Sequence, residues 1–75
     1  MAFTDGTFRV GTEIKPGTYH TDGQGGGCYY ERDRKGDGVD AIIANDNLSG
    51  PTTIDIQPSD YAFKSSGGCA WTRVS

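Results

Sequence analysis

Hydrophobic and polar residues alternate over short stretches of this chain, and no stretch keeps a helical period. In Thr7–Val10 the aromatic and aliphatic side chains fall on one side, and Thr52–Ile56 repeats the pattern. A period of two is typical of strands in half-buried antiparallel sheets. The pattern predicts seven strands: Thr7–Val10, Gly17–Thr21, Cys28–Asp33, Ala41–Ala44, Thr52–Ile56, Tyr61–Lys64 and Ala70–Val74.

Glycine, proline, asparagine and aspartate separate the predicted strands every eight to twelve residues or so. One such group, Asn45-Asp46-Asn47, is predicted to form a turn that ends the strand at Ala44. Short strands with this spacing predict an all-β fold, a small antiparallel β-sandwich or barrel of about seven strands. We expect one domain over residues 1–75.

A seven-residue motif occurs twice, as Gly26–Arg32 and Gly67–Arg73, and both copies read G-G-C-x-aromatic-x-R. With a period of two, the cysteine, the aromatic residue and the arginine of each copy share one face. The repeat predicts neighbouring or facing strands joined by a Cys28–Cys69 disulfide above the aromatic residues. The alternative is a cytosolic protein with two reduced, buried thiols.

A disulfide would matter greatly in a chain of 75 residues. Such a domain has a thin core and usually needs a staple. A bridge closing a loop of about 42 residues is worth about 4 kcal/mol in the chain-entropy model. It would also indicate an oxidising location outside the cell or on a virion.

Charge and composition exclude several classes of partner. The net charge is −3, and Arg32, Arg34 and Lys35 form a basic cluster interrupted by acids. We therefore expect no nucleic-acid or anionic-membrane binding. No apolar run could span a bilayer or form the core of a signal peptide. The chain is expected to be either a piece of a larger secreted protein or a small protein exported by another route.

The residue types needed for catalysis or cofactor binding are not combined in the required patterns. His20, the single histidine, alternates with Tyr19 and is expected at the surface, and a disulfide removes the thiol nucleophiles. Asp33, Asp37 and Asp40 do not fit the spacing of a calcium loop, so a hairpin turn is the simpler interpretation. We expect a non-catalytic protein without metal or cofactor.

Aromatic side chains are the remaining candidates for recognition. Tyr29 is predicted to project outward, opposite Cys28, where a tyrosine suits sugar stacking or a protein interface. Its ring could equally be partly covered without binding anything. Tyr61 and Phe63 share one face of their strand and are expected in the core. The candidate interface residues are Tyr29, Arg32, Arg34 and His20.

Several motifs along nearly the whole chain resemble a small all-β domain of unknown function. It recurs in secreted and lipid-anchored proteins of actinobacteria and their phages. The motifs are Asp5–Gly11, Ile14–Tyr19, Cys28–Arg32, Ile42–Asn47, Gly50–Thr52, Pro58–Asp60, Phe63 and Gly68–Thr72. The family usually has Trp where this chain has Tyr30. The resemblance implies a bridge between Cys28 and Cys69, an extracellular or virion-exterior location, and no enzymatic activity or cofactor.

Three functions follow from these features as hypotheses. The first is an accessory or decoration protein outside an actinobacteriophage particle, bound to a capsid or tail lattice and oligomeric in that context. The alternative is a secreted or lipoprotein-borne recognition domain that binds cell-wall glycan or protein. The third is a small enzyme or enzyme inhibitor.

Overall fold

The protein is described by a computed structural model that covers residues 2–23, 27–36 and 39–75. These residues form eight strands and one 3-10 turn. In chain order the elements are β1 (Ala2–Phe3), β2 (Gly6–Arg9), β3 (Gly17–Thr21), β4 (Cys28–Asp33), η1 (Val39–Ala41), β5 (Ile42–Leu48), β6 (Thr52–Ile56), β7 (Ala62–Ser66) and β8 (Trp71–Arg73). The all-β prediction is confirmed.

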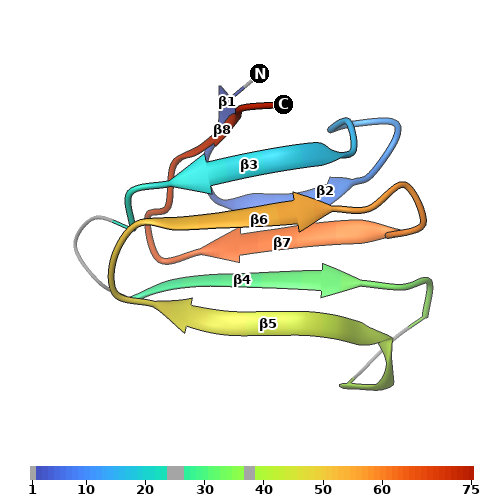
Figure 1. Cartoon of the computed structure of the whole chain (residues 1–75). Helices are drawn as coiled ribbons and strands as arrows, with labels where there is room; N and C mark the ends of the chain where they lie inside the picture. The colour runs from blue at the N-terminus through green and yellow to red at the C-terminus, as the bar shows by residue number, and fades with distance from the viewer. Residues whose placement is uncertain (1, 24–26, 37–38) are drawn as a thin grey trace.

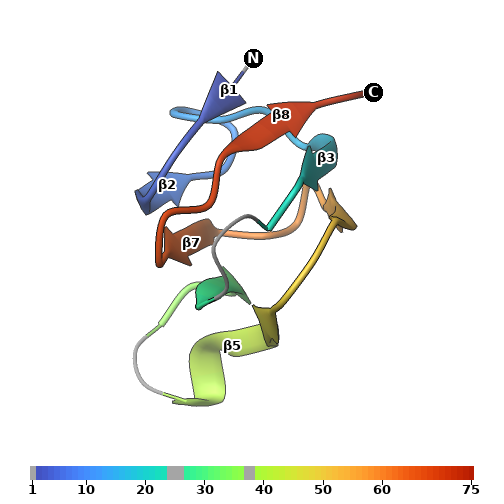
Figure 2. The ribbon, with the colours of Figure 1, turned by 90° about the vertical axis from the view of Figure 1, so that its left-hand side faces the viewer.

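The strands form two antiparallel sheets, and the sheets pack as a sandwich. The first sheet has the order β1-β8-β3-β6, and the second has the order β2-β7-β4-β5. Both termini lie at the β1–β8 end, whereas β5 lies at the opposite edge (Figures 1 and 2). In the described part of the chain, no helix is long and apolar enough to cross a membrane.

The predicted alternation places the core correctly. Trp71, Tyr19 and Phe63 are fully buried, and Ile54 and Ile56 face inward from β6. The Phe63 and Trp71 rings meet edge to face, with centroids 5.4 Å apart. Burying such a side chain contributes about 2–3 kcal/mol. The interior is therefore built around aromatic rings from both sheets.

The predicted bounds of β3, β4 and β6 are confirmed, whereas the predicted bounds of the other strands differ from the observed ones. The Asn45-Asp46-Asn47 turn is wrong, because these residues continue β5 and pair with Glu31, Tyr30 and Tyr29. Leu48 ends β5 as a buried anchor, so packing outweighs the turn propensity of the polar residues. The short strand β1, which adds Phe3 to the core, was not predicted and raises the count to eight.

Tyr61 is the second correction. It lies just before β7 and is half-buried, outside the core cluster that contains Phe63. The guanidinium of Arg9 stacks over its ring, 4.1 Å from the centroid. The alternation of inward and outward side chains does not extend to Tyr61, because this residue precedes the first residue of β7.

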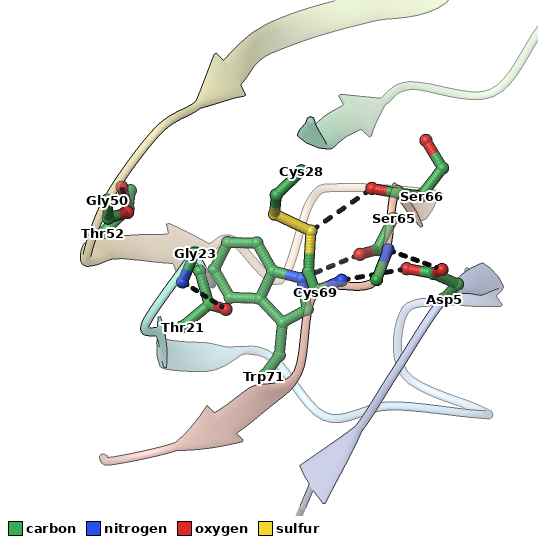
Figure 3. Close-up of a disulfide and its surroundings, with 11 residues drawn as sticks. Asp5, Thr21, Gly23, Cys28, Gly50, Thr52, Ser65, Ser66, Cys69 and Trp71 are labelled. Atoms are coloured by element: carbon green, nitrogen blue, oxygen red, sulfur yellow. Dashed lines mark hydrogen bonds between the residues drawn. A yellow bond between two sulfur atoms is a disulfide. The ribbon is translucent and has the colours of Figure 1, made fainter. Parts of the chain in front are cut away.

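The Cys28–Cys69 disulfide is confirmed, and it joins β4 of the second sheet to the segment that leads into β8 of the first. The repeat therefore marks facing strands. Figure 3 shows the Trp71 indole beside the bridge, with its N–H donating to Ser65 Oγ at 2.9 Å. Asp5 accepts hydrogen bonds from the backbone N–H groups of Gly68 and Cys69. The cross-link and these bonds fasten the two sheets at one end.

Candidate functional site

The predicted interface residues do not come together in the structure. Tyr29 lies on the outer face of the second sheet, and His20 lies on the outer face of the first, so the two are on opposite sides of the sandwich. Arg34 follows β4, is exposed and donates to the backbone oxygen of Asp40. These three residues cannot line one surface.

Arg32 is half-buried, with its side chain 19% exposed. It faces inward from β4, as the repeat predicts, and its guanidinium donates to both carboxylate oxygens of Asp60 at 2.7 and 3.0 Å. The hydrogen bond to Asp60 raises the pKa of Arg32. The Asp60 side chain is 1% exposed, so the ion pair is structural.

The opposite face of β4 carries the strongest chemical feature of the molecule. Glu31 and Asp33, called the carboxyl pair below, both point outward, yet they are only 8% and 6% exposed. Lys64 lies across on β7, directly opposite Glu31. Its Nζ is 3.5 Å from Glu31 Oε2 and 3.7 Å from Asp33 Oδ2. One half-exposed ammonium thus faces two buried acids.

Tyr29 and Asn45 extend this cluster toward β5. The Tyr29 hydroxyl donates to Glu31 Oε1 at 2.7 Å, and Asn45 Nδ2 donates to the Tyr29 oxygen at 3.1 Å. These bonds fix the ring of Tyr29 on the sheet. We call Tyr29, Glu31, Asp33, Asn45 and Lys64 the polar face.

The two acids of the pair differ in their electrostatics. The hydrogen bond from Tyr29 lowers the pKa of Glu31. Desolvation raises the pKa of Asp33 to about 6. The hydrogen bond that protonated Asp33 donates to Glu31, and repulsion by the Glu31 charge, contribute to this rise. Lys64 opposes this rise, and its own pKa is raised, mainly by Glu31. Asp33 is therefore the group of the pair that holds a proton to the higher pH.

Two further observations concern Asp33. Its Oδ1 atom is buried and has no hydrogen-bond partner among the described residues. The pairing of β4 with β5 shifts between Arg32 and Asp33, where Ile43 is the extra residue. Such bulges occur often beside functional sites, because they re-aim side chains. An orphaned buried acceptor next to a bulge is unusual in a structure built only for stability.

His20 belongs to a separate, exposed arrangement. Its Nδ1 is 2.9 Å from Thr53 Oγ1, and its Nε2 is 3.3 Å from Asp22 Oδ1. A hydroxyl, an imidazole and a carboxylate in this order could in principle activate a nucleophile. The imidazole and the Asp22 carboxylate are 39% and 68% exposed, so the surroundings offer little desolvation. A surface histidine is the simpler description.

The acids that were considered for calcium do not form a site in the described structure. Asp33 faces Glu31 and Lys64, Asp40 is exposed on η1, and Asp37 lies outside the described residues. No group of three or more His, Cys, Asp or Glu side chains in residues 2–23, 27–36 and 39–75 could hold a metal ion.

Sequence reasoning missed Glu31, Asn45 and Lys64, and it considered Asp33 only as a calcium ligand. A signal existed, since the period of β4 that places Cys28 inward places Tyr, Glu and Asp together on the other face. Their burial depends on which β5 and β7 residues lie opposite, and the sequence alone does not reveal that register.

Comparison with known proteins adds a setting to this geometry. Residues 1–73 match the family model of the Rv1352-like extracellular domain. No curated protein and no solved structure matches the chain. The match confirms an extracellular family domain over nearly the whole chain, and the disulfide agrees with that location. It does not extend to a phage or a virion.

Proposed function

This chain belongs to the family of Rv1352-like extracellular domains, and we propose that it is a non-catalytic recognition domain that binds a cell-surface glycan. Its binding surface is the polar face of the second sheet. This is the alternative function expected from the sequence, and the family match favours it over the virion role.

The carboxyl pair is the observation that carries the proposal. An outward-facing position on a sheet is normally filled by solvated residues, whereas Glu31 and Asp33 are each more than nine-tenths buried. Two adjacent buried acids repel each other, and one half-exposed lysine compensates only in part. Proteins keep such destabilising arrangements mainly at functional sites.

The chemistry of the face favours a glycan over a protein partner. Amide, phenol and carboxyl groups dominate it, and these pair with sugar hydroxyls. Cores of protein interfaces concentrate large apolar side chains. In the described parts of the chain, Ile43 and Val74 are the exposed large hydrophobic residues.

The hollows in the surface of the described residues lie away from the polar face. Enzymes usually bind their substrates in concave pockets. A groove of about 460 Å³ is lined by Pro16–Thr18 and Asp55–Pro58, and a hollow of about 120 Å³ lies at Thr21–Gly23, Gly68 and Ala70. Neither includes a member of the polar face.

The test is co-sedimentation of the domain with isolated, protein-free cell walls of the producing organism. Wild-type protein is expected in the pellet, and Glu31→Gln and Asn45→Ala should weaken binding about tenfold, as expected for lost ligand hydrogen bonds. His20→Gln, on the opposite face, is the matched control and should bind like wild type. Equal binding by all four proteins, or none by any, would contradict the proposal.

Docking onto a protein lattice is a second candidate function, and the free edge of β5 favours it. Among the described strands, β5 pairs with β4 alone, so the other edge of its seven residues is open to an extended partner or a second copy that adds a strand. A virion accessory protein could use such a contact. Purified phage particles that carry this polypeptide would support the role, and particles that lack it would count against it.

A further inference from the structure

We propose that the carboxyl pair is a subsite for a primary ammonium group, so that the glycan recognised by this domain carries free amino sugars. The inference rests on the proposed function and names the chemistry of its ligand. It concerns Glu31 and Asp33 as the groups that contact the ligand amine.

The chain itself shows that an ammonium fits this position. Lys64 Nζ lies within 4 Å of an oxygen of each acid, at 3.5 and 3.7 Å. Both distances exceed the 2.7–2.9 Å or so of a direct charge-assisted hydrogen bond. The lysine side chain is 49% exposed, so its ion pairs are weak and can be displaced. Lys64 therefore occupies the subsite loosely, as a competitor for a ligand amine.

The buried oxygen Asp33 Oδ1 supplies the second, independent reason. It lacks a partner, although the aspartate residue is only 6% exposed. A buried acceptor without a donor is costly, and a cation bound at the neighbouring Oδ2, the oxygen that Lys64 approaches, offsets part of that cost by neutralising the carboxylate. An ammonium has three donors and can bond to both acids at once.

Charge distinguishes an amine from the neutral groups of a sugar. With both acids ionised, Glu31 and Asp33 carry two negative charges against the single positive charge of Lys64. The two acids outnumber the lysine, so a ligand ammonium meets net negative charge and can take the place of Lys64, whereas a hydroxyl or an acetamide would leave both charges without a cation. Since charge-assisted bonds are about twice as strong as neutral ones, we expect the amine to bind at least about tenfold more tightly than its N-acetyl counterpart.

Binding should also depend on pH. The groups that interact with Asp33 are Glu31 and Tyr29 on β4 and Lys64 on β7, and the β5 residue paired with it is the uncharged Ile42. Burial and Glu31 raise the pKa of Asp33 to about 6. An ammonium favours the ionised carboxylate, so amine binding should weaken as the pH falls below about 6.

The experiment compares two pairs of ligands at pH 6.5. The first pair is a glucosamine tetramer and its fully N-acetylated form, followed by shifts of the backbone amide NMR signals of β4 and β7. The second pair is the isolated walls before and after N-acetylation with acetic anhydride, followed by co-sedimentation. The amine-bearing member of each pair should bind more tightly, and Asp33→Asn should remove most of that difference.

Lys64→Met gives the sharpest prediction, because it removes the competitor. The variant should bind the glucosamine tetramer several-fold more tightly than wild type, with no change for the N-acetylated tetramer. Tetralysine is the third ligand, and tighter binding of it than of the glucosamine tetramer would assign the subsite to a protein amine and overturn the glycan inference. If acetylated walls bind as well as untreated ones while Glu31→Gln still weakens binding, the ammonium subsite is refuted and the glycan function stands.

Discussion

Asp33→Asn should stabilise the fold at neutral pH, although it removes a charged residue from an ion-paired cluster. The buried carboxylate of Asp33 repels Glu31 and lacks a partner for Oδ1. Asparagine has nearly the same shape and no charge. Its amide can also donate to Glu31, as the protonated acid does.

The size of the effect follows from the pKa of Asp33, which rises from 3.8 to about 6 in the folded protein. A difference of about two pH units corresponds to about 3 kcal/mol of destabilisation once the group is ionised. The variant also loses the weak attraction to Lys64 and the pair titrates as a unit, so the expected gain at pH 7.5 is about 1–3 kcal/mol.

The raised pKa of Asp33 also fixes the direction in which the free energy of unfolding changes with pH. Between about pH 4.5 and 6.5 the folded protein holds the Asp33 proton more tightly than the unfolded chain, so stability should fall as the pH rises through this window. The lowered pKa of Glu31 acts in the opposite direction, since it makes stability rise with pH. That change occurs at pH values below 4.5, the ordinary pKa of Glu31. In Asp33→Asn the decline should disappear.

Urea unfolding followed by the fluorescence of Trp71 measures both quantities at a series of pH values. Asp40→Asn, at an exposed position, is the charge-matched control, and a His20→Gln background removes the single imidazole from the comparison. An Asp33→Asn protein that is less stable than wild type at pH 7.5 would show that the Asp33 carboxylate stabilises the fold. That result, or a wild-type stability that rises between pH 4.5 and 6.5, would refute the destabilising role of the carboxylate.

Three further predictions concern the scaffold. Reduction of the disulfide should lower the free energy of unfolding by about 4 kcal/mol in urea titrations with and without dithiothreitol. Arg32→Ala should lower the free energy of unfolding by about 3–5 kcal/mol in the same assay, because Asp60 stays buried and charged. Arg32→Lys should be more stable than Arg32→Ala but less stable than wild type, since lysine cannot pair with the carboxylate through two nitrogens. Gly67→Ala should lower the urea midpoint several-fold more than Gly11→Ala. Both glycines have positive φ, but an added Cβ at Gly67 would overlap the backbone oxygen of Gly27, whereas at Gly11 it meets nothing within 4 Å.

The fold was largely predictable because its strands obey a simple alternation. β3, β4 and β6 are flanked by glycine or proline, and the burial of β3 and β6 alternates between an inner and an outer face, so local chemistry and packing agree there. The repeated cysteine motif also gave the correct link between the sheets. The prediction failed in β5, where Asn45-Asp46-Asn47 has the composition of a turn and the long pairing with β4 holds it extended.

The candidate site was less predictable, for a physical reason. Period two places Tyr29, Glu31 and Asp33 on one face, but their burial and the compensating charge of Lys64 come from residues more than ten positions away in sequence. Lys64 lies opposite Glu31 through the β4–β7 register, and Asn45 reaches Tyr29 through β5. Neither register follows from local pattern, so the charge balance of the site becomes visible only in the folded sheet.

Strand β4 connects the stability of the domain to its proposed function. Its inner face carries Cys28, whose bridge contributes about 4 kcal/mol, and its outer face carries the carboxyl pair, whose Asp33 costs about 3 kcal/mol when ionised. The two effects are similar in size and opposite in sign. A small domain with a total stability of only about 5 kcal/mol could hardly keep two buried acids at neutral pH without the bridge. The disulfide therefore does more than compensate for a thin core, because it lets the outer face of the same strand keep charges that a ligand can neutralise.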